Sequence, residues 1–459
     1  MTPQPFRTLA VPTPEALLFG RAPRPVTCGT GLVIGGGSVY PEINFTLPPM
    51  LIEPGTWDAV RSIYAETMDN IVERAEQLGL EGLVVEFEQL PPMTANAAWG
   101  AELTEVIKTR LETARERFGL KSAVRVTIID LREEVKPPPR RAGESWDQML
   151  AALEQSAARG GDILSIESTG GKEVHDVALT HADLPGIALA LGVLAPADMS
   201  WLWDQFVGVA SRHPGVIAGG DSACGFANTA MQLAEKRMLP EVLAALDRVM
   251  TCVRALVAFE RGAVGPSKDC AYEGPVMKAI AGVPISMEGR SATCAHLSSI
   301  GNIAAAMTDL WSNESVPDVR LLSGPAPVAS LESLVYDCRL FNAAVAAQQE
   351  RVLRDLHVAS DARRSPQAYV LTPEATIAIA RAIVGETDPY RRVLAAARTA
   401  FELLRAGHAD GAVVLNVREQ RWLDKLQKAC DALPPTAEEL IAATRGKYGE
   451  LYDPASYGL

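Results

Sequence analysis

Two cysteines of this chain lie among turn-forming and polar residues, where a thiol is available for chemistry. Cys224 occurs in GGDSACGFANTAM (219–231) and Cys270 in GPSKDCAYEG (265–274). A structural cysteine usually sits within an apolar run, whereas Asp, Ser, Gly and Asn favour turns, helix caps and ligand contacts. A carboxylate, Glu167, lies at the end of another apolar run. These three residues are the candidate metal ligands.

Two thiolates and one carboxylate form a ligand set that suits Zn²⁺ and leaves its fourth tetrahedral position open. A substrate oxygen can occupy that position, where the ion lowers the pKa of the oxygen and stabilises a developing alkoxide. No local motif joins Glu167, Cys224 and Cys270, so only the fold can bring them together. Taken alone, the residue types favour a simpler alternative, in which buried cysteines and a hydrogen-bonded glutamate bind no metal.

The elements that must position these residues alternate between short β-rich runs and helical patterns. Strands are predicted at residues 42–48, 82–88, 123–130, 163–168, 215–221, 282–288 and 318–324, with a further strand between 235 and 265. Amphipathic stretches with helical spacing, such as residues 56–79, separate them. Near-continuous apolar strands that alternate with helices imply a parallel sheet covered on both faces. About eight such units predict an α/β fold, the closed (β/α)₈ or TIM barrel.

The pattern divides the chain into three predicted domains. Residues 1–41 form an N-terminal extension, and residues 42–360 form the catalytic barrel. After residue 360 the strand signal stops, and residues 361–459 read as a helical segment that packs on the barrel or on a partner. The last helix of this segment begins with a capping box from Thr436 to Glu439.

Functional groups of such a barrel gather at the carboxyl ends of its strands. Three residues there are candidates to hold the ligand loops or to cap the helices that follow: Asp221, Asn228 and Lys268. Three more are candidate proton carriers or structural carboxylates, and none is assigned as catalytic: Glu86, Asp130 and Glu288. Three histidines are potential ligands by type only: His175, His181 and His296.

Composition excludes several function classes. The chain of 459 residues has a formal net charge of −13, from 56 acidic and 43 basic residues, and contains no basic block, so nucleic acid is not expected as a partner. The N-terminus lacks the pattern of a secretory signal. The longest apolar run, residues 184–196, is interrupted by Pro and Gly and is too short to span a bilayer. We therefore expect a soluble cytoplasmic protein with no membrane partner.

The cysteines are scattered and include no CxxC pair, which argues against a disulfide framework and a zinc ribbon. Five of them are expected to pack as small hydrophobic side chains: Cys28, Cys252, Cys294, Cys338 and Cys430. The glycine-rich residues 29–37 precede the first predicted barrel strand and do not join a strand to a helix. We therefore do not interpret them as a phosphate-binding loop.

Four segments carry a resemblance to a known family. GGGSVYPEINFTLP (35–48), SIESTGGKEVHD (165–176) and the two cysteine segments resemble the zinc-containing catalytic subunit of the methanol:corrinoid methyltransferases of methanogens and acetogens. The resemblance runs from about residue 15 to the end of the chain. It implies a zinc-dependent (β/α)₈ barrel that works with a separate corrinoid protein.

The resemblance also implies roles for individual residues. Glu167, Cys224 and Cys270 match the zinc ligands of the family, with one zinc per chain and no catalytic residue beyond these ligands. The implied reaction transfers the methyl group of methanol to Co(I) of a corrinoid, while zinc activates the methanol oxygen as leaving group. The chain has no Asp-x-His-x-x-Gly segment of a cobamide carrier, so the corrinoid is expected on the partner. A homodimer core within a hetero-oligomer is implied as well.

Other functions stay open at this stage. The same zinc and corrinoid chemistry could serve another methyl donor, such as a methoxylated compound. A non-catalytic assembly subunit could keep the barrel and the helical segment as an interaction surface. A zinc-dependent hydrolase would activate water at the same ion, although no feature of the sequence indicates a hydrolytic substrate.

Overall fold

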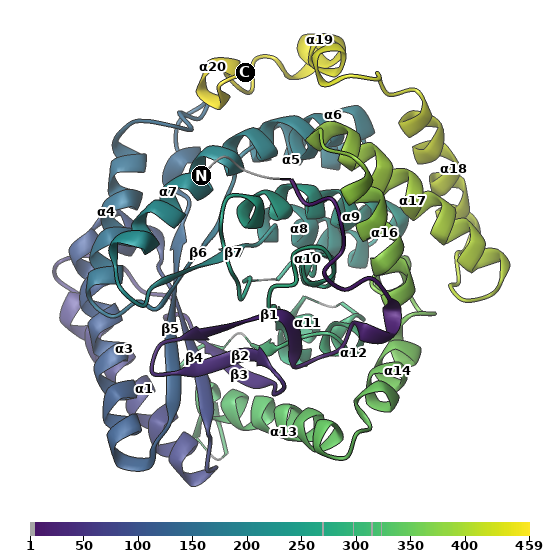
Figure 1. The fold of residues 1–459 in the computed structure, drawn as a ribbon. Helices are drawn as coiled ribbons and strands as arrows, with labels where there is room; N and C mark the ends of the chain where they lie inside the picture. The colour runs from purple at the N-terminus through teal and green to yellow at the C-terminus, as the bar shows by residue number, and fades with distance from the viewer. Residues whose placement is uncertain (1–4, 269, 297, 314, 323) are drawn as a thin grey trace.

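A parallel sheet forms the centre of the molecule in the computed structural model, which describes residues 5–459 except 269, 297, 314 and 323 (Figure 1). The sheet order is β7-β6-β5-β4-β3-β9-β8. In chain order the strands are β3 (Tyr40–Asn44), β4 (Gly82–Glu88), β5 (Lys121–Ile129), β6 (Ile163–Glu167), β7 (Ile217–Asp221), β8 (Ser286–Glu288) and β9 (Leu310–Ser312). Their side chains are almost all buried, as expected for a sheet covered on both faces.

A short segment, residues 264–267, closes this sheet into a barrel. On one side, the N–H groups of Val264 and Gly265 donate to the carbonyls of Ala218 and Gly219 in β7, each at 2.9 Å. On the other side, Ser286 at the start of β8 donates to the carbonyl of Ser267 at 3.1 Å. The segment thus takes the eighth strand position, and the predicted (β/α)₈ barrel is confirmed. The rest of the ambiguous window between 235 and 265 is mainly helix α9 (Glu241–Glu260).

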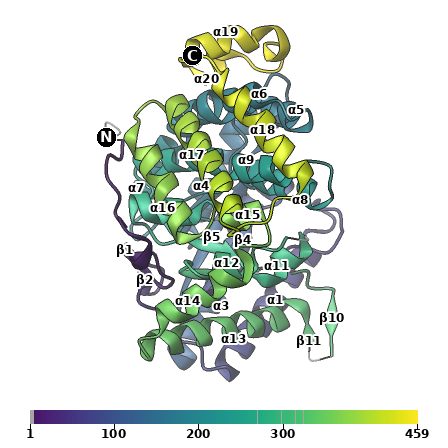
Figure 2. The same cartoon turned by 90° about the vertical axis from the view of Figure 1, so that its right-hand side faces the viewer.

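The predicted strand at 318–324 is wrong. Its place in the barrel belongs to β9, only three residues long, which lies between an alanine-rich helix and a polar loop and therefore gives no periodic signal. Arg320–Leu321 (β10) and Gly324–Pro325 (β11) instead pair as a small antiparallel hairpin that projects from the body of the molecule (Figure 2). The apolar side chains Leu321 and Leu322 are exposed there.

Helices follow each strand and form the outer layer. The main ones are α1 (Trp57–Gln77), α3 (Ala97–Phe118), α4 (Glu144–Ala158), α7 (Ala195–Arg212), α9, α10 (Gly274–Ala281) and α13 (Ala326–Ala346). One continuous helix, Leu184–Arg212, is long and apolar enough to cross a membrane, because a π-helical turn carries it through the expected interruptions at Gly192 and Pro196. In this fold 83% of its most apolar window is buried, as in the core helix of a soluble protein.

The N-terminal hairpin of β1 (Arg21–Cys28) and β2 (Leu32–Gly36) covers the amino ends of the barrel strands. Cys28, Leu32 and Ile34 pack against the barrel side chains Val84, Ala123, Ile163 and Leu310. Gly29 adopts a φ of +53°, and a Cβ there would lie 2.0 Å from the carbonyl oxygen of Ser122, so only glycine fits this approach. The glycine-rich segment therefore plugs the barrel.

The C-terminal segment is helical as predicted, and its main helices are α16 (Pro373–Gly385), α17 (Pro389–Ala409), α18 (Val417–Asp431) and α19 (Ala437–Tyr448). They lie on one side of the barrel, light green to yellow in Figure 1, and pack on α9, α10 and α6 (Leu184–Leu189). Thr436 Oγ1 accepts a hydrogen bond from the N–H of Glu439 at 3.3 Å, as the capping box predicts. The division into three domains stays a prediction.

A buried histidine pair links two of the covering helices. His175 Nε2 on α5 (Lys172–Thr180) lies 2.8 Å from Asp247 Oδ1 on α9, and both side chains are fully buried. Desolvation lowers the pKa of His175, but the charges and hydrogen bonding of Asp247 and Asp176 together outweigh it and raise this pKa to about 9. The folded-state pKa lies above the unfolded value. The stabilisation is therefore complete at low pH and is lost as the pH rises through about 9.

We expect His175→Gln to remove this pH dependence. Between its ordinary pKa of 6.5 and about 9, the wild type should lose up to about 3 kcal/mol of unfolding free energy that the variant does not lose. Urea unfolding at a series of pH values measures the difference. His181→Gln, at an exposed position after the same helix, is the control. Identical pH profiles for the wild type and His175→Gln would contradict the assignment.

Candidate metal centre

Three neighbouring strand positions of the barrel carry the candidate ligands. Glu167 is the last residue of β6, Cys224 begins a π-helical turn shortly after β7, and Cys270 follows the closing segment 264–267. One ligand atom of each, a carboxylate oxygen and two sulfurs, lies within 4.8 Å of the others. The fold thus brings together residues that are far apart in sequence. Their assignment as metal ligands stays a prediction.

The two sulfurs are in contact, and the structure pairs Cys224 and Cys270 as a disulfide with Cα atoms 5.5 Å apart. Neither the spacing nor the composition indicated this pairing. The thiolate is the form that binds a metal, so a bound ion requires the reduced pair. When reduced, the site offers two sulfurs and one carboxylate oxygen, the donor set of a zinc site with an open position. The residues fit zinc in that state.

Lys268 supplies the positive charge beside the ligands. Its Nζ lies 2.8 Å from Glu167 Oε1, 3.2 Å from Glu86 Oε1 and 3.5 Å from Glu88 Oε1. Desolvation opposes the charged form, but the three carboxylates outweigh it and hold the pKa of Lys268 well above its usual value. Lys268 therefore connects the end of β4 with the end of β6. The sequence predicted Lys268 at the ligand loops, and the structure shows that its partners there are these three glutamates.

The carboxylates around Lys268 differ in how easily they ionise. Desolvation raises the pKa of Glu167 to about 7, and the charges of Glu88 and Glu86 add to this effect while Lys268 opposes it. Desolvation also acts on Glu86, but Lys268 and Arg125 outweigh it and lower the pKa of Glu86. A bound cation inverts such a balance because it is the largest local charge. A bound cation would therefore hold Glu167 in its ionised form.

Asp221 and Asn228, the other two predicted supports, also contact the ligand loops. Asp221 accepts hydrogen bonds from the N–H and hydroxyl of Ser168, at 3.2 and 2.6 Å, and so ties the residue after Glu167 to β7. Asn228 Nδ2 donates to Cys224 Sγ at 3.5 Å. The Asn228 side chain does not cap α8 (Thr229–Glu235), so its alternative role as a cap is wrong.

Two further supports, Ser222 and Glu273, were not predicted. Ser222 Oγ accepts the N–H of Cys270 at 3.2 Å and lies 3.4 Å from its Sγ. Glu273 Oε1 accepts the N–H of Ala223 at 3.0 Å, which joins the two cysteine loops. Both residues lie within the two cysteine segments, and this position could have indicated their role from the sequence.

Comparison with known proteins decides the family. A family model described as methanol-cobalamin methyltransferase B subunit matches residues 4–458. The methanol–corrinoid protein co-methyltransferase of Methanosarcina barkeri (strain Fusaro / DSM 804) is 36% identical over 461 residues, with 99% of each chain covered. The chain belongs to the methanol-cobalamin methyltransferase B subunit family. A crystal structure of the methanol:cobalamin methyltransferase complex MtaBC from Methanosarcina barkeri superposes with a TM-score of 0.95 at 35% identity, covering 99% of this chain and 100% of the other.

Family membership makes the chain a methyltransferase, and it confirms the resemblance and the barrel. The remaining candidates of this methyltransferase have structural partners. Buried Asp130 pairs with Arg132, which outweighs burial and holds the pKa of that carboxyl well below its usual range, and it also accepts the N–H of Thr169. Glu288 Oε2 lies 3.6 Å from His296 Nδ1.

The three candidate histidines lie outside the ligand cluster of this methyltransferase, as far as the structure describes the chain. His175 is engaged with Asp247, and exposed His181 hydrogen-bonds to the carbonyl of Val177 at 2.7 Å. The expectation for the remaining cysteines holds for four of them, which are buried, and is wrong for Cys294, which is exposed. Cys294 lies on α11 (Arg290–Ala295), the short helix that follows β8.

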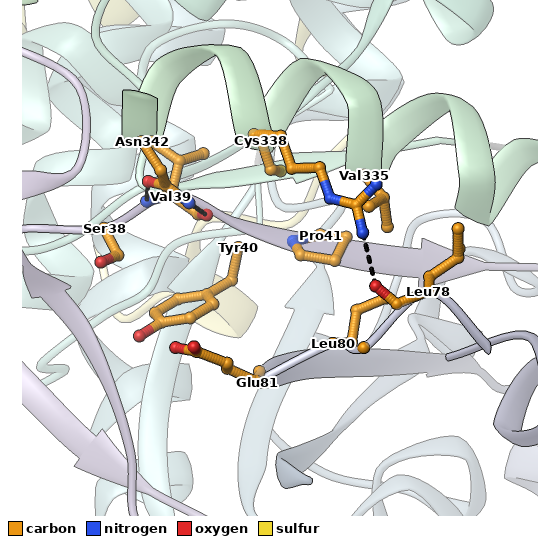
Figure 3. A pocket seen from close by; sticks show the side chains of 13 residues that line it. Ser38, Val39, Tyr40, Pro41, Leu78, Leu80, Glu81, Val335, Cys338 and Asn342 are labelled. Carbon is orange, nitrogen blue, oxygen red and sulfur yellow. Dashed lines mark hydrogen bonds between the residues drawn. The ribbon is translucent and has the colours of Figure 1, made fainter. Parts of the chain in front are cut away.

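A surface pocket of about 320 Å³ lies at the opposite end of the barrel, where β3 and β4 begin (Figure 3). Arg339 in this pocket donates to the carbonyl of Leu78, and the amide of Asn342 bonds both backbone groups of Val39. These side chains hold α13 against the amino ends of the strands. The pocket contains none of the candidate ligands.

Replacing Lys268 with methionine should destabilise the methyltransferase by about 3–5 kcal/mol, because it leaves buried carboxylates without their cation. Urea unfolding of Lys268→Met, Glu86→Gln and the double variant measures the coupling, and the double variant should lose less than the sum of the single losses. Lys447→Met removes an equally close but surface pair with Asp183 and should cost less than about 1 kcal/mol. Equal losses for the two lysine variants would contradict this account of the cluster.

Proposed function

We propose that this chain transfers the methyl group of methanol to the Co(I) centre of a corrinoid held by a separate protein, with zinc bound by Glu167, Cys224 and Cys270. The observation that carries the proposal is the convergence of two sulfurs and a carboxylate within 4.8 Å at the carboxyl ends of the barrel strands. The relative from Methanosarcina barkeri is a methanol–corrinoid protein co-methyltransferase, which indicates the substrate and the class of acceptor.

When bound, zinc supplies electrophilic assistance to the methanol oxygen, since hydroxide is otherwise a poor leaving group. The residues of the chain have separate tasks around it. Cys224, Cys270 and Glu167 would hold the ion, and three protein ligands would leave room for the alcohol. Lys268 keeps a proton on Nζ beside Glu167 and offsets the charges of the neighbouring glutamates.

The partner completes the site under this proposal. The chain lacks a cobamide-carrier segment, so the corrinoid must reach the barrel mouth on another protein. Arrival of that protein would cover the mouth and exclude water from the site. We also propose a homodimer core for the complex, following the family resemblance.

Metal analysis tests the ligands directly. We expect about one zinc per chain in the reduced wild type, and strong loss of zinc in Cys224→Ala, Cys270→Ala and Glu167→Gln because each removes a ligand. Cys252→Ala removes a buried cysteine outside the site and should retain the full metal content. Full zinc retention in both ligand cysteine variants would mean that these residues bind no metal, and the proposed function would fail with them.

An assay of Co(I) methylation tests the methyl donor. The zinc-loaded, reduced protein with its corrinoid partner should methylate cobalt from methanol, and a methoxylated benzoate should give no product. The corrinoid absorption spectrum reports the conversion of Co(I) to methyl-Co(III), and a chelator-treated sample restored with zinc is the control. Methylation from the methoxylated compound and not from methanol would show that the methoxylated compound is the methyl donor. Zinc binding without methylation by either donor would instead favour a non-catalytic assembly subunit.

A further inference from the structure

Helix α9 is buried throughout its length, yet it carries charges at its centre. Every residue from Val242 to Phe259 is buried, including Asp247, Arg248 and Arg254. A buried arginine is costly unless its guanidinium has close partners. Several partners of these two arginines lie on the loops that carry the candidate ligands.

Arg254 contacts the loops of two ligands at once. Its Nη2 donates to the carbonyl of Ser168 at 3.2 Å and to the Ser168 hydroxyl, and Ser168 directly follows Glu167. The same nitrogen lies 3.5 Å from Asp221 Oδ2, at the end of β7 just before Cys224. The guanidinium carbon also lies 4.8 Å from the ring centroid of Phe226, within the turn that Cys224 begins.

Arg248 contacts the loop of the third ligand. It donates to the carbonyl of Ala271, directly after Cys270, and its guanidinium carbon lies 5.4 Å from the ring centroid of Tyr272. Tyr272 has a φ of +62°, a conformation that a bulky residue rarely adopts and that its surroundings must enforce. Arg248 Nη2 also donates to Gln367 Oε1 at 3.1 Å, which anchors this contact to the C-terminal helices.

We propose that Arg248 and Arg254 are positioning residues that set the three ligands relative to one another, with α9 as their common reference. The two residues lie six positions apart, so about 9 Å of one rigid helix spans the loops. A planar guanidinium can hold several acceptors and an aromatic face together, which lysine cannot do. The inference rests on the proposed metal site, and neither arginine is assigned a contact with substrate.

Zinc affinity is the property that separates positioning from simple structural support. Arg254→Met and Arg248→Met keep all three ligands, and each should weaken zinc binding about 10- to 100-fold in a chelator competition with the reduced protein. Substituting cobalt(II) for zinc should reveal altered sulfur-to-metal charge-transfer bands in both variants. Arg354→Met is the matched control, because Arg354 is buried and donates to the carbonyls of Pro14 and Leu17, away from the ligand loops.

The control variant Arg354→Met separates a loss of stability from a loss of zinc affinity. All three methionine variants should lose stability in thermal unfolding, but Arg354→Met should keep the zinc affinity and the cobalt spectrum of the wild type. Wild-type affinity and spectra in Arg254→Met and Arg248→Met would overturn the positioning role while leaving the metal site intact. A wild type that binds no zinc would instead overturn the proposed function. If Arg254→Met does not fold, Arg254→Lys carries the same test and should show a partial loss of zinc affinity.

Discussion

The whole site depends on the hydrogen bonds that hold residues 264–267 between β7 and β8. This segment is too short and too irregular to count as a strand, yet its backbone groups bond to both neighbours and close the barrel. Closure fixes where the chain leaves the sheet just before Lys268 and Cys270. It thereby places that loop beside the ends of β6 and β7, where Glu167 and Cys224 lie.

Closure also forces charged side chains into the barrel, and these must be paired. Arg125 of β5 donates to Glu42 of β3 at 2.5 Å, and also to Ser165 and to the carbonyl of Pro266. This network joins four strand positions around the barrel. At the carboxyl ends of the strands, Lys268 pairs with glutamates of β4 and β6 in the same way. Buried charges inside the barrel are therefore paired in successive layers. The candidate metal centre lies in the layer at the carboxyl ends of the strands.

The sequence pattern predicted those elements whose signal is long. The bounds of β4, Gly82–Glu88, agree with the prediction, and the helical character of residues 361–459 followed from their amphipathic spacing. A three-residue strand such as β9 carries no periodicity, so the apolar hairpin nearby was chosen in its place. In the site, the proximity of the three ligands followed once a barrel was assumed. The partners of Lys268, Arg248 and Arg254 depend on strand register and helix rotation, which no single sequence displays. Arg125 and Glu42, two opposite charges within apolar strands, were the visible signs of the inner network.

Burial around the ligands also sets the direction from which the site is reached. Cys270 is 1% exposed, whereas Cys224 and Glu167 are only partly buried, so the cluster meets solvent on the side of β6 and β7. Both of these loops are the ones that Arg254 holds. Under the proposed function, a corrinoid must approach the methyl carbon across this side, because Cys270 on the other side of the cluster is buried. Glu167 and Cys224, which would face the partner, are then also the ligands whose loops α9 restrains most directly. The solvent-exposed side of the site is therefore held rigidly.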